Sequence, residues 1–241
     1  DADVISMSMA RATYSAELAE AVRNATEQGS TVVIAAGNSR QTTRWVGSPA
    51  DTPVEGVLTV GAASVNTSNT TDVGSTLPAH FSQIGPDAGV ADLSSGVTSG
   101  EGVDLVAPGM KVSAATPTTS RTRTNTSLSG TSMATPMVAG AIAQVLDERP
   151  AWRDSPARVA GYARNTTRVM PNGSVSAVGN GYLATDQLLA AEEHDETQGE
   201  ARSDAARARD AGWRTLSNAS GGLVARVLTQ VSVGSVMRGA A

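Results

Sequence analysis

The apolar residues of this chain fall into short runs and helical stripes, and the two patterns alternate along the sequence. Four runs rich in Val, Ile, Leu and Ala have the length of strands, and they lie at 4–9, 31–36, 57–62 and 103–107. The run at 31–36 is continuous, which is typical of a parallel strand buried on both faces. Between the first two runs, residues 15–27 carry apolar side chains at helical spacing and predict a helix.

Two further segments predict helices. An alanine-rich apolar run at 137–146 predicts a buried helix, and residues 155–163 predict another, capped by Ser155 with Pro156 at its first position. Gly29 is expected to end the helix at 15–27. The order strand, helix, strand indicates βαβ units with right-handed crossovers. We therefore predict an α/β fold with three layers, a mostly parallel sheet covered by helices on both faces.

Polar segments separate these elements. Residues 65–102 and 116–125 are rich in Ser, Thr, Asn and Gly and are predicted to be surface loops, the first with a strand-like piece around Phe81. The composition changes near residue 190, where a charged and then mildly apolar stretch begins. The sequence thus predicts one domain over 1–190 and a C-terminal extension over 191–241, to which no role is assigned.

Composition narrows the classes of protein that the chain can belong to. Its 241 residues are 40% hydrophobic, which is enough for one sizeable core, but only 3% aromatic, so aliphatic side chains and alanine must fill that core. A net charge of −5 without a basic patch gives no reason to expect a nucleic-acid partner. Without cysteine there are no disulfides or thiolate metal sites. No apolar stretch reaches the length of a membrane span.

The candidate chemistry centres on the heptad Gly-Thr-Ser-Met-Ala-Thr-Pro at 130–136. It places Ser132 between a glycine and the apolar run that predicts a buried helix. A serine in the first turn of a helix has an exposed hydroxyl, a free backbone N–H and the positive end of the helix dipole beside it. Acyl transfer requires a nucleophile with such a donor next to it. An isolated Gly-Thr-Ser would more often be an ordinary helix cap, so the rest of the sequence must decide.

The full heptad resembles the nucleophile segment of the subtilisin-like serine peptidases, the subtilases. Further segments resemble the same family in order and spacing, over about residues 1–190, and they lie at 3–9, 33–38, 81–86, 104–109 and 149–181. The resemblance implies a subtilisin-like fold, and it implies a serine endopeptidase that acts on polypeptides. The family's catalytic aspartate and histidine precede its strand matching 3–9, so we expect this sequence to be the C-terminal part of the catalytic domain.

The resemblance also assigns roles to individual residues. Ser132 is the expected nucleophile, and the side-chain amide of Asn38 is expected to donate to the oxyanion beside the Ser132 N–H. Two backbone segments are expected to pair with an extended substrate as added strands. They consist of Ser8, Met9 and Ala10 and of Ala35, Ala36 and Gly37. The family usually has two glycines where this chain has Ala10 and Arg11, so we expect a narrower pocket and do not transfer the family's specificity.

A base for Ser132 is missing from the expected positions. The chain has two histidines, His80 and His194, and neither matches the family's catalytic histidine. A serine without a base is a weak nucleophile, so we expect the chain as given to be nearly inactive. An N-terminal segment that supplies Asp and His would make the protein an active peptidase. Without one, the fold would be a peptide-binding or scaffolding module. A hydrolase in which His80 serves Ser132 is a third alternative, which the strand spacing disfavours.

Catalysis of this type requires no cofactor, and no metal ligands are assigned. The family often contains structural calcium, and the loop at 49–53 offers carbonyl oxygens, which leave no signature in a sequence. Secretion is expected from the family only, since no signal peptide is visible.

Overall fold

A mostly parallel sheet forms the centre of the fold. The computed structural model describes residues 2–65, 73–85, 102–115 and 125–190. Six strands in this part of the chain form one sheet in the order β1-β2-β3-β4-β8-β7. Their bounds are Val4–Met7, Thr31–Ala35, Val57–Ala63, Leu105–Pro108, Tyr182–Leu183 and Thr167–Arg168, in that order. All neighbours are parallel except β7 and β8.

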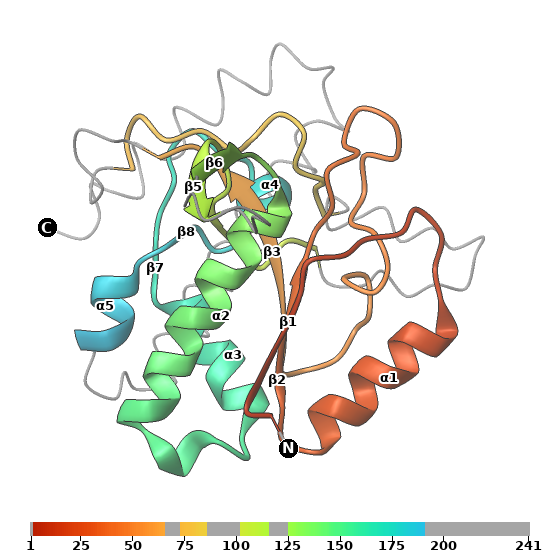
Figure 1. Ribbon diagram of the computed structural model, residues 1–241, viewed down its shortest axis with the longest axis vertical. Helices are drawn as coiled ribbons and strands as arrows, with labels where there is room; N and C mark the ends of the chain where they lie inside the picture. Colours follow the sequence, from red (N-terminus) through yellow and green to blue (C-terminus); the bar gives the residue numbers. More distant parts are fainter. Residues whose placement is uncertain (1, 66–72, 86–101, 116–124, 191–241) are drawn as a thin grey trace, which may run out of the picture. The chain divides into compact units, whose positions relative to one another are not determined.

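Helices cover both faces of this sheet, as the sequence predicts (Figure 1). They are α1 (Ala16–Glu27), α2 (Thr131–Glu148), η1 (Pro150–Trp152), α3 (Pro156–Asn165), α4 (Val175–Val178) and α5 (Thr185–Ala190). Alternate side chains of β2 divide between the faces, because successive residues of a strand point in opposite directions. Val33 packs in the core beneath α2 and α3, whereas Val32 and Ile34 pack in the core beneath α1.

A second, two-stranded antiparallel sheet follows β4. It pairs β5 (Val112–Ala115) with β6 (Asn125–Leu128), and it leads into α2. The polar composition of β6 conceals it in the sequence, where its first residue falls in a predicted loop. Most of its residues are exposed, so no apolar stripe marks it.

Most predicted elements are confirmed, and one, the strand-like piece at Phe81, is wrong. Ser15 caps α1, its hydroxyl accepting from the Leu18 N–H at 3.4 Å. Ser155 stands at the matching position of α3 but makes no capping hydrogen bond, because its ψ of 63° departs from the extended backbone of a capping serine. Phe81 lies in a turn and not in a strand, since the Ser82 N–H closes back on the Ala79 carbonyl at 3.0 Å.

The extension predicted over 191–241 lies outside the described residues, as do large parts of the two predicted loops. The boundary near residue 190 therefore stays a prediction. Within the described ranges, no helix combines the length and apolarity that a bilayer crossing demands.

An ion pair, with Arg164 20% and Asp104 9% exposed, holds α3 against the strands of the sheet. The Arg164 guanidinium donates to the Asp104 carboxylate at 2.7 Å and to the Val57 carbonyl at 2.8 Å. The other carboxylate oxygen of Asp104 accepts from the Thr59 N–H at 2.6 Å. One ion pair thus holds α3 and the beginnings of β3 and β4 together.

Replacing Arg164→Met should destabilise the fold by about 3 kcal/mol, because it leaves a buried carboxylate without its cation. Urea unfolding measures the change. Arg23→Met is the matched control, since Arg23 pairs with Glu20 on the exposed face of α1, and it should cost less than about 1 kcal/mol. Equal losses for the two variants would contradict a fastening role for Arg164.

Candidate active site

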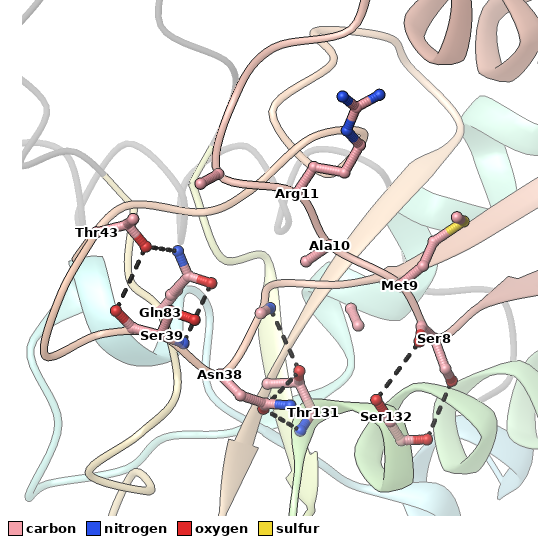
Figure 2. Close-up of a pocket in the computed structure, with 13 residues that line it drawn as sticks. Ser8, Met9, Ala10, Arg11, Asn38, Ser39, Thr43, Gln83, Thr131 and Ser132 are labelled. Carbon is pink, nitrogen blue, oxygen red and sulfur yellow. Dashed lines mark hydrogen bonds between the residues drawn. The ribbon is translucent and has the colours of Figure 1, made fainter.

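Three segments converge around Ser132. The carboxyl ends of β1 and β2 meet the first turn of α2, in which Ser132 is the second residue. The residues between them line an open cleft of about 190 Å³ (Figure 2). We call it the Ser132 cleft, and its described lining consists of residues 8–12, 35, 37–39, 43, 83, 131 and 132. Seven of the eight site residues predicted from the sequence line this cleft, and Ala36 is the exception.

Asn38 is bound to the beginning of α2. Its Oδ1 accepts from the Thr131 N–H at 2.8 Å and from the Thr131 hydroxyl at 3.0 Å. A backbone N–H can only donate, so the atom facing it must be the oxygen, and the orientation of the Asn38 amide is fixed. The Thr131 hydroxyl in turn accepts from the Gly37 N–H at 3.3 Å. Asn38 therefore caps the helix through its oxygen and keeps Nδ2 for another acceptor.

Ser132 and Ser8 are joined by a reciprocal pair of contacts. The Ser8 hydroxyl donates to the Ser132 carbonyl at 3.0 Å, and the Ser132 hydroxyl lies 3.5 Å from the Ser8 carbonyl (Figure 2). The Ser132 carbonyl is available because the residue four positions later is Pro136, which has no N–H to donate. A proline inside α2 thus leaves an acceptor at the cleft, and the end of β1 occupies it.

Two glycines make the close approach of these segments possible. A Cβ on Gly130 would lie 3.3 Å from Asn38 Nδ2, which is tighter than ordinary packing. Gly37 has a φ of 108°, and a Cβ there would lie 1.8 Å from Gln83 Oε1. Gly37 therefore requires glycine for both space and backbone conformation, whereas a side chain at Gly130 would push on the Asn38 amide.

The segments predicted to pair with substrate lie where an extended peptide could reach them, with one difference. Ser8, Met9, Ala10, Ala35 and Gly37 line the Ser132 cleft. Ala36 does not, because its N–H donates to the Val60 carbonyl and its carbonyl accepts from the Gly47 N–H. Pairing with a peptide at these positions stays a prediction.

Ala10 and Arg11 close one end of the cleft. The backbone N–H and carbonyl of Arg11 pair with those of Ser48 at 2.9 and 3.0 Å. The Ala10 methyl lies 3.2 Å from the point where a Cβ on Gly37 would stand. Arg11 is the one charged residue in the described lining, and Figure 2 shows its guanidinium turned away from Ser132.

No histidine or carboxylate lines the Ser132 cleft within the described ranges. His80 is exposed and stacks edge-on against Phe81, with 5.3 Å between ring centroids, and it is not part of the lining. His194 lies outside the described residues. Ser132 has no acceptor for its proton here except the distant Ser8 carbonyl.

The loop at 49–53 holds two buried oxygens without a hydrogen-bond partner, Asp51 Oδ1 and Thr52 Oγ1. Burial raises the pKa of the Asp51 carboxyl above its usual range. Calcium takes six to eight oxygen ligands, and one carboxylate with one hydroxyl is a small part of such a set. Nowhere in the described parts do three or more His, Asp or Glu side chains gather as metal ligands.

Sequence reasoning missed two residues of this site, Thr131 and Gln83. Thr131 is fully buried and carries the hydrogen bonds that orient Asn38. The heptad places Thr131 next to Ser132, but the sequence gives no sign that Thr131 bonds to Asn38, which lies 93 positions away. Gln83 sits in a segment whose apolar neighbours suggested a strand, and nothing local indicates that its amide reaches the cleft.

A family model and curated relatives both match most of this chain. A family model described as "Subtilase family" matches residues 1–182. Subtilisin BL from Lederbergia lenta is 34% identical over 180 residues, which cover 75% of this chain and 54% of that protein. Subtilisin E from Bacillus subtilis (strain 168) is 34% identical over 158 residues, covering 65% of this chain and 34% of that protein. The chain therefore spans about half or less of the length of these relatives.

Solved structures agree on the fold. S41 psychrophilic protease superimposes with a TM-score of 0.58 at 26% identity, over 75% of this chain and 56% of that one. Fervidolysin from Fervidobacterium pennivorans, a keratinolytic enzyme related to subtilisin, gives a TM-score of 0.57 at 25% identity. That match covers 74% of this chain and 25% of fervidolysin.

Two substitutions of Asn38 should separate the role of its oxygen, which caps α2, from the role of its Nδ2 as a donor. Asn38→Ala removes the acceptor for Thr131 and should cost about 1–2 kcal/mol of unfolding free energy, as loss of a helix cap does. Asn38→Asp keeps the acceptor and adds negative charge at a helix N-terminus, so its stability should equal or exceed that of the unchanged chain. Urea unfolding of both variants tests this. If Asn38→Asp lost as much stability as Asn38→Ala, the cap assigned to Oδ1 would be wrong.

Proposed function

The chain belongs to the subtilase family, and from that premise we propose that it acts as the Ser132-bearing part of a serine endopeptidase. In this proposal a base takes the Ser132 hydroxyl proton as Oγ attacks the carbonyl carbon of a peptide bond. The C–N bond then breaks and the amine leaves with that proton, after which water hydrolyses the acyl-enzyme and restores the Ser132 hydroxyl. The observation that carries the proposal is the orientation of Asn38. Its oxygen is held by Thr131, so its Nδ2 remains to donate toward the carbonyl under attack.

The oxyanion would receive two donors. Among the described residues the Ser132 N–H has no acceptor, and it lies at the positive end of α2. Asn38 Nδ2 is the second donor, and it lies 3.3 Å from the point where a Cβ on Gly130, the residue before Thr131, would stand. Donors fixed before the reaction stabilise developing charge without reorganisation, which is the main contribution of such a site to rate.

The base is proposed to come from a segment that pairs along the open edge of β1. The residues of β2 and β3 are fully buried, whereas those of β1 are half-buried or exposed, although Ile5 and Met7 pack against a core cluster. Strands inside a parallel sheet are buried on both faces and paired on both sides, whereas an edge strand has one side on which another strand can pair. A strand added parallel to β1 would end beside Ser8, which contacts Ser132. An aspartate and a histidine supplied there would complete the catalytic group.

Polypeptides are the proposed substrates, bound as an extended strand between residues 8–10 and 35–37. Secretion is proposed from the family membership. A structural calcium ion is a separate proposal, for which Asp51 and Thr52 supply two buried oxygens without partners.

Without the added segment, Ser132 should react very slowly. We expect the chain as given to show negligible labelling by a fluorophosphonate probe, because no base lies at Ser132 in the described structure. The same chain, produced with an N-terminal segment that supplies the aspartate and the histidine, should label rapidly and hydrolyse casein. Gel fluorescence and peptide release measure the two effects, with Ser132→Ala as the control for both.

Three results would contradict this account. Rapid labelling of the chain as given would show that a base is already present. Labelling that survives Ser132→Ala would exclude Ser132 as nucleophile. An extended protein that binds peptides but never labels would favour the alternative of a peptide-binding module, and a preceding sequence without Asp and His would point the same way.

In the extended, active protein, Asn38→Asp should lower kcat with little change in KM, because the donor acts on charge that develops only in the transition state. The expected loss is about 100- to 1,000-fold, a figure measured for the corresponding donor of subtilisin and not on this chain. Steady-state kinetics on a peptide amide measures it. A rise in KM at unchanged kcat would instead assign Asn38 to substrate binding.

A further inference from the structure

We propose that Gln83 selects the substrate side chain next to the bond that is cut, favouring an uncharged side chain that donates a hydrogen bond. This inference rests on the proposed function, because it names the substrate class of the same cleft. The side chains of asparagine, glutamine, serine and threonine meet that description. Large apolar side chains and carboxylates do not.

Gln83 reaches the cleft from outside the segments that carry the proposed chemistry. It is only 3% exposed, yet it belongs to the lining of the Ser132 cleft. Its Oε1 lies beneath Gly37, at 1.8 Å from the point where a Cβ would stand. Figure 2 shows its amide beside Ser39 and Thr43, on the side of Asn38 away from Ser8. The side chain therefore forms the inner wall of the cleft next to the proposed oxyanion donor.

The hydrogen bonds of Gln83 determine what it can offer to a ligand. Its Nε2 donates to the Thr43 hydroxyl at 2.8 Å and to the Trp45 carbonyl. The Trp45 carbonyl can only accept, so the nitrogen must face it and both of its hydrogens are used. Oε1 accepts one long bond, from the Ser39 N–H at 3.4 Å. An amide oxygen has two lone pairs, so the atom that Gln83 can offer is an acceptor.

Charge in the cleft excludes ionised side chains. The described lining has no carboxylate to bind a lysine or arginine of the substrate, and its one charge is the cation of Arg11. A carboxylate of the substrate would face the Gln83 oxygen, which repels it, while the Arg11 guanidinium points away (Figure 2). A neutral donor satisfies the Gln83 oxygen without either penalty.

Size restricts the choice further. The Ala10 methyl closes on the same wall, 3.2 Å from the Cβ position of Gly37 and 3.3 Å from that of Gly47. The whole cleft measures about 190 Å³, including the space in front of Ser132. Ala10 thus narrows the wall beside the tethered amide, and we expect a phenylalanine side chain to fit there less well than an asparagine.

Peptide binding to the full chain tests the proposal without requiring catalysis. The probes are acetyl-Ala-Ala-X peptides with a free carboxylate, where X is Asn, Asp, Leu or Phe. Asn, Asp and Leu are close in size, so they separate hydrogen bonding and charge from volume. Titration of the 15N-labelled chain, followed at the amides of Gly37 and Asn38, gives each Kd. We expect X = Asn to bind about five- to tenfold more tightly than Leu or Asp, the effect of one net hydrogen bond.

Two variants assign the preference to its source. Gln83→Met keeps the length of the side chain but removes the acceptor, and it should abolish the preference for Asn over Leu. Ala10→Gly should strengthen binding of the Phe peptide and leave the ratio of the Asn to the Leu affinity unchanged. This variant keeps the hydrogen bonds of Gln83 to Thr43 and Trp45, so it still tests the proposal if Gln83→Met fails to fold. Thr42→Ala is the matched control, because it removes another bond of the same loop, to the Ser39 carbonyl at 3.1 Å. It should change neither ratio.

The outcomes distinguish this inference from the function on which it rests. Binding of Leu, Asp or Phe as tight as Asn, with shifts at Gly37 and Asn38, would overturn the selectivity and leave a peptide-binding cleft in place. A preference for Asn that survives Gln83→Met would overturn the role of Gln83. Absence of any shift at Gly37 and Asn38 with all four peptides would overturn both proposals.

Discussion

The capping of α2 by Asn38 is the interaction on which the arrangement of the site depends. One oxygen atom joins the end of β2 to a helix that begins 93 positions later in the sequence. A helix N-terminus needs acceptors for its first N–H groups, and here a neighbouring strand supplies one in place of the preceding residue, Gly130. Because that acceptor belongs to a side-chain amide, capping the helix also orients an N–H₂ group. The residue that caps the helix is thereby the one proposed to stabilise the oxyanion.

Pro136 shows how a local cost in α2 is offset at the cleft. A proline inside a helix removes one hydrogen bond and crowds the preceding turn. In α2 the carbonyl that loses its partner is that of Ser132, and the Ser8 hydroxyl at the end of β1 bonds to it. The helix thus gives up one internal bond and gains one to the strand that forms the opposite wall. Proline is unfavourable for the helix itself, but here it frees an acceptor for a contact with β1. Such conflicts between local preference and tertiary contacts are expected at functional sites.

The parts of the fold that the sequence predicts well are those with strong periodicity. The runs that became β2 and β3 are buried throughout, β4 is buried except at Pro108, and the stripe that became α1 has its serine cap in place. The parts that escape prediction depend on distant partners. Nothing near Gln83 shows that Thr43 and Trp45 hold its amide, and the exposed, polar β6 has no apolar stripe. The turn at Phe81 has the pattern of a short strand, because apolar and polar residues alternate from Ala79 to Ser82.

Nucleophile and base place different demands on this sheet, which explains how one can be ordered without the other. Ser132 is positioned by contacts with the ends of β1 and β2, all of them inside the described structure. The proposed base has to meet α2 only at the Ser132 hydroxyl, which it would reach from beyond the edge of β1. The proposed nucleophile, its proposed oxyanion donors and the wall formed by Gln83 are therefore held in place by the described fold alone. On these proposals, peptide binding would depend on the fold described here, whereas turnover would depend on what pairs with β1.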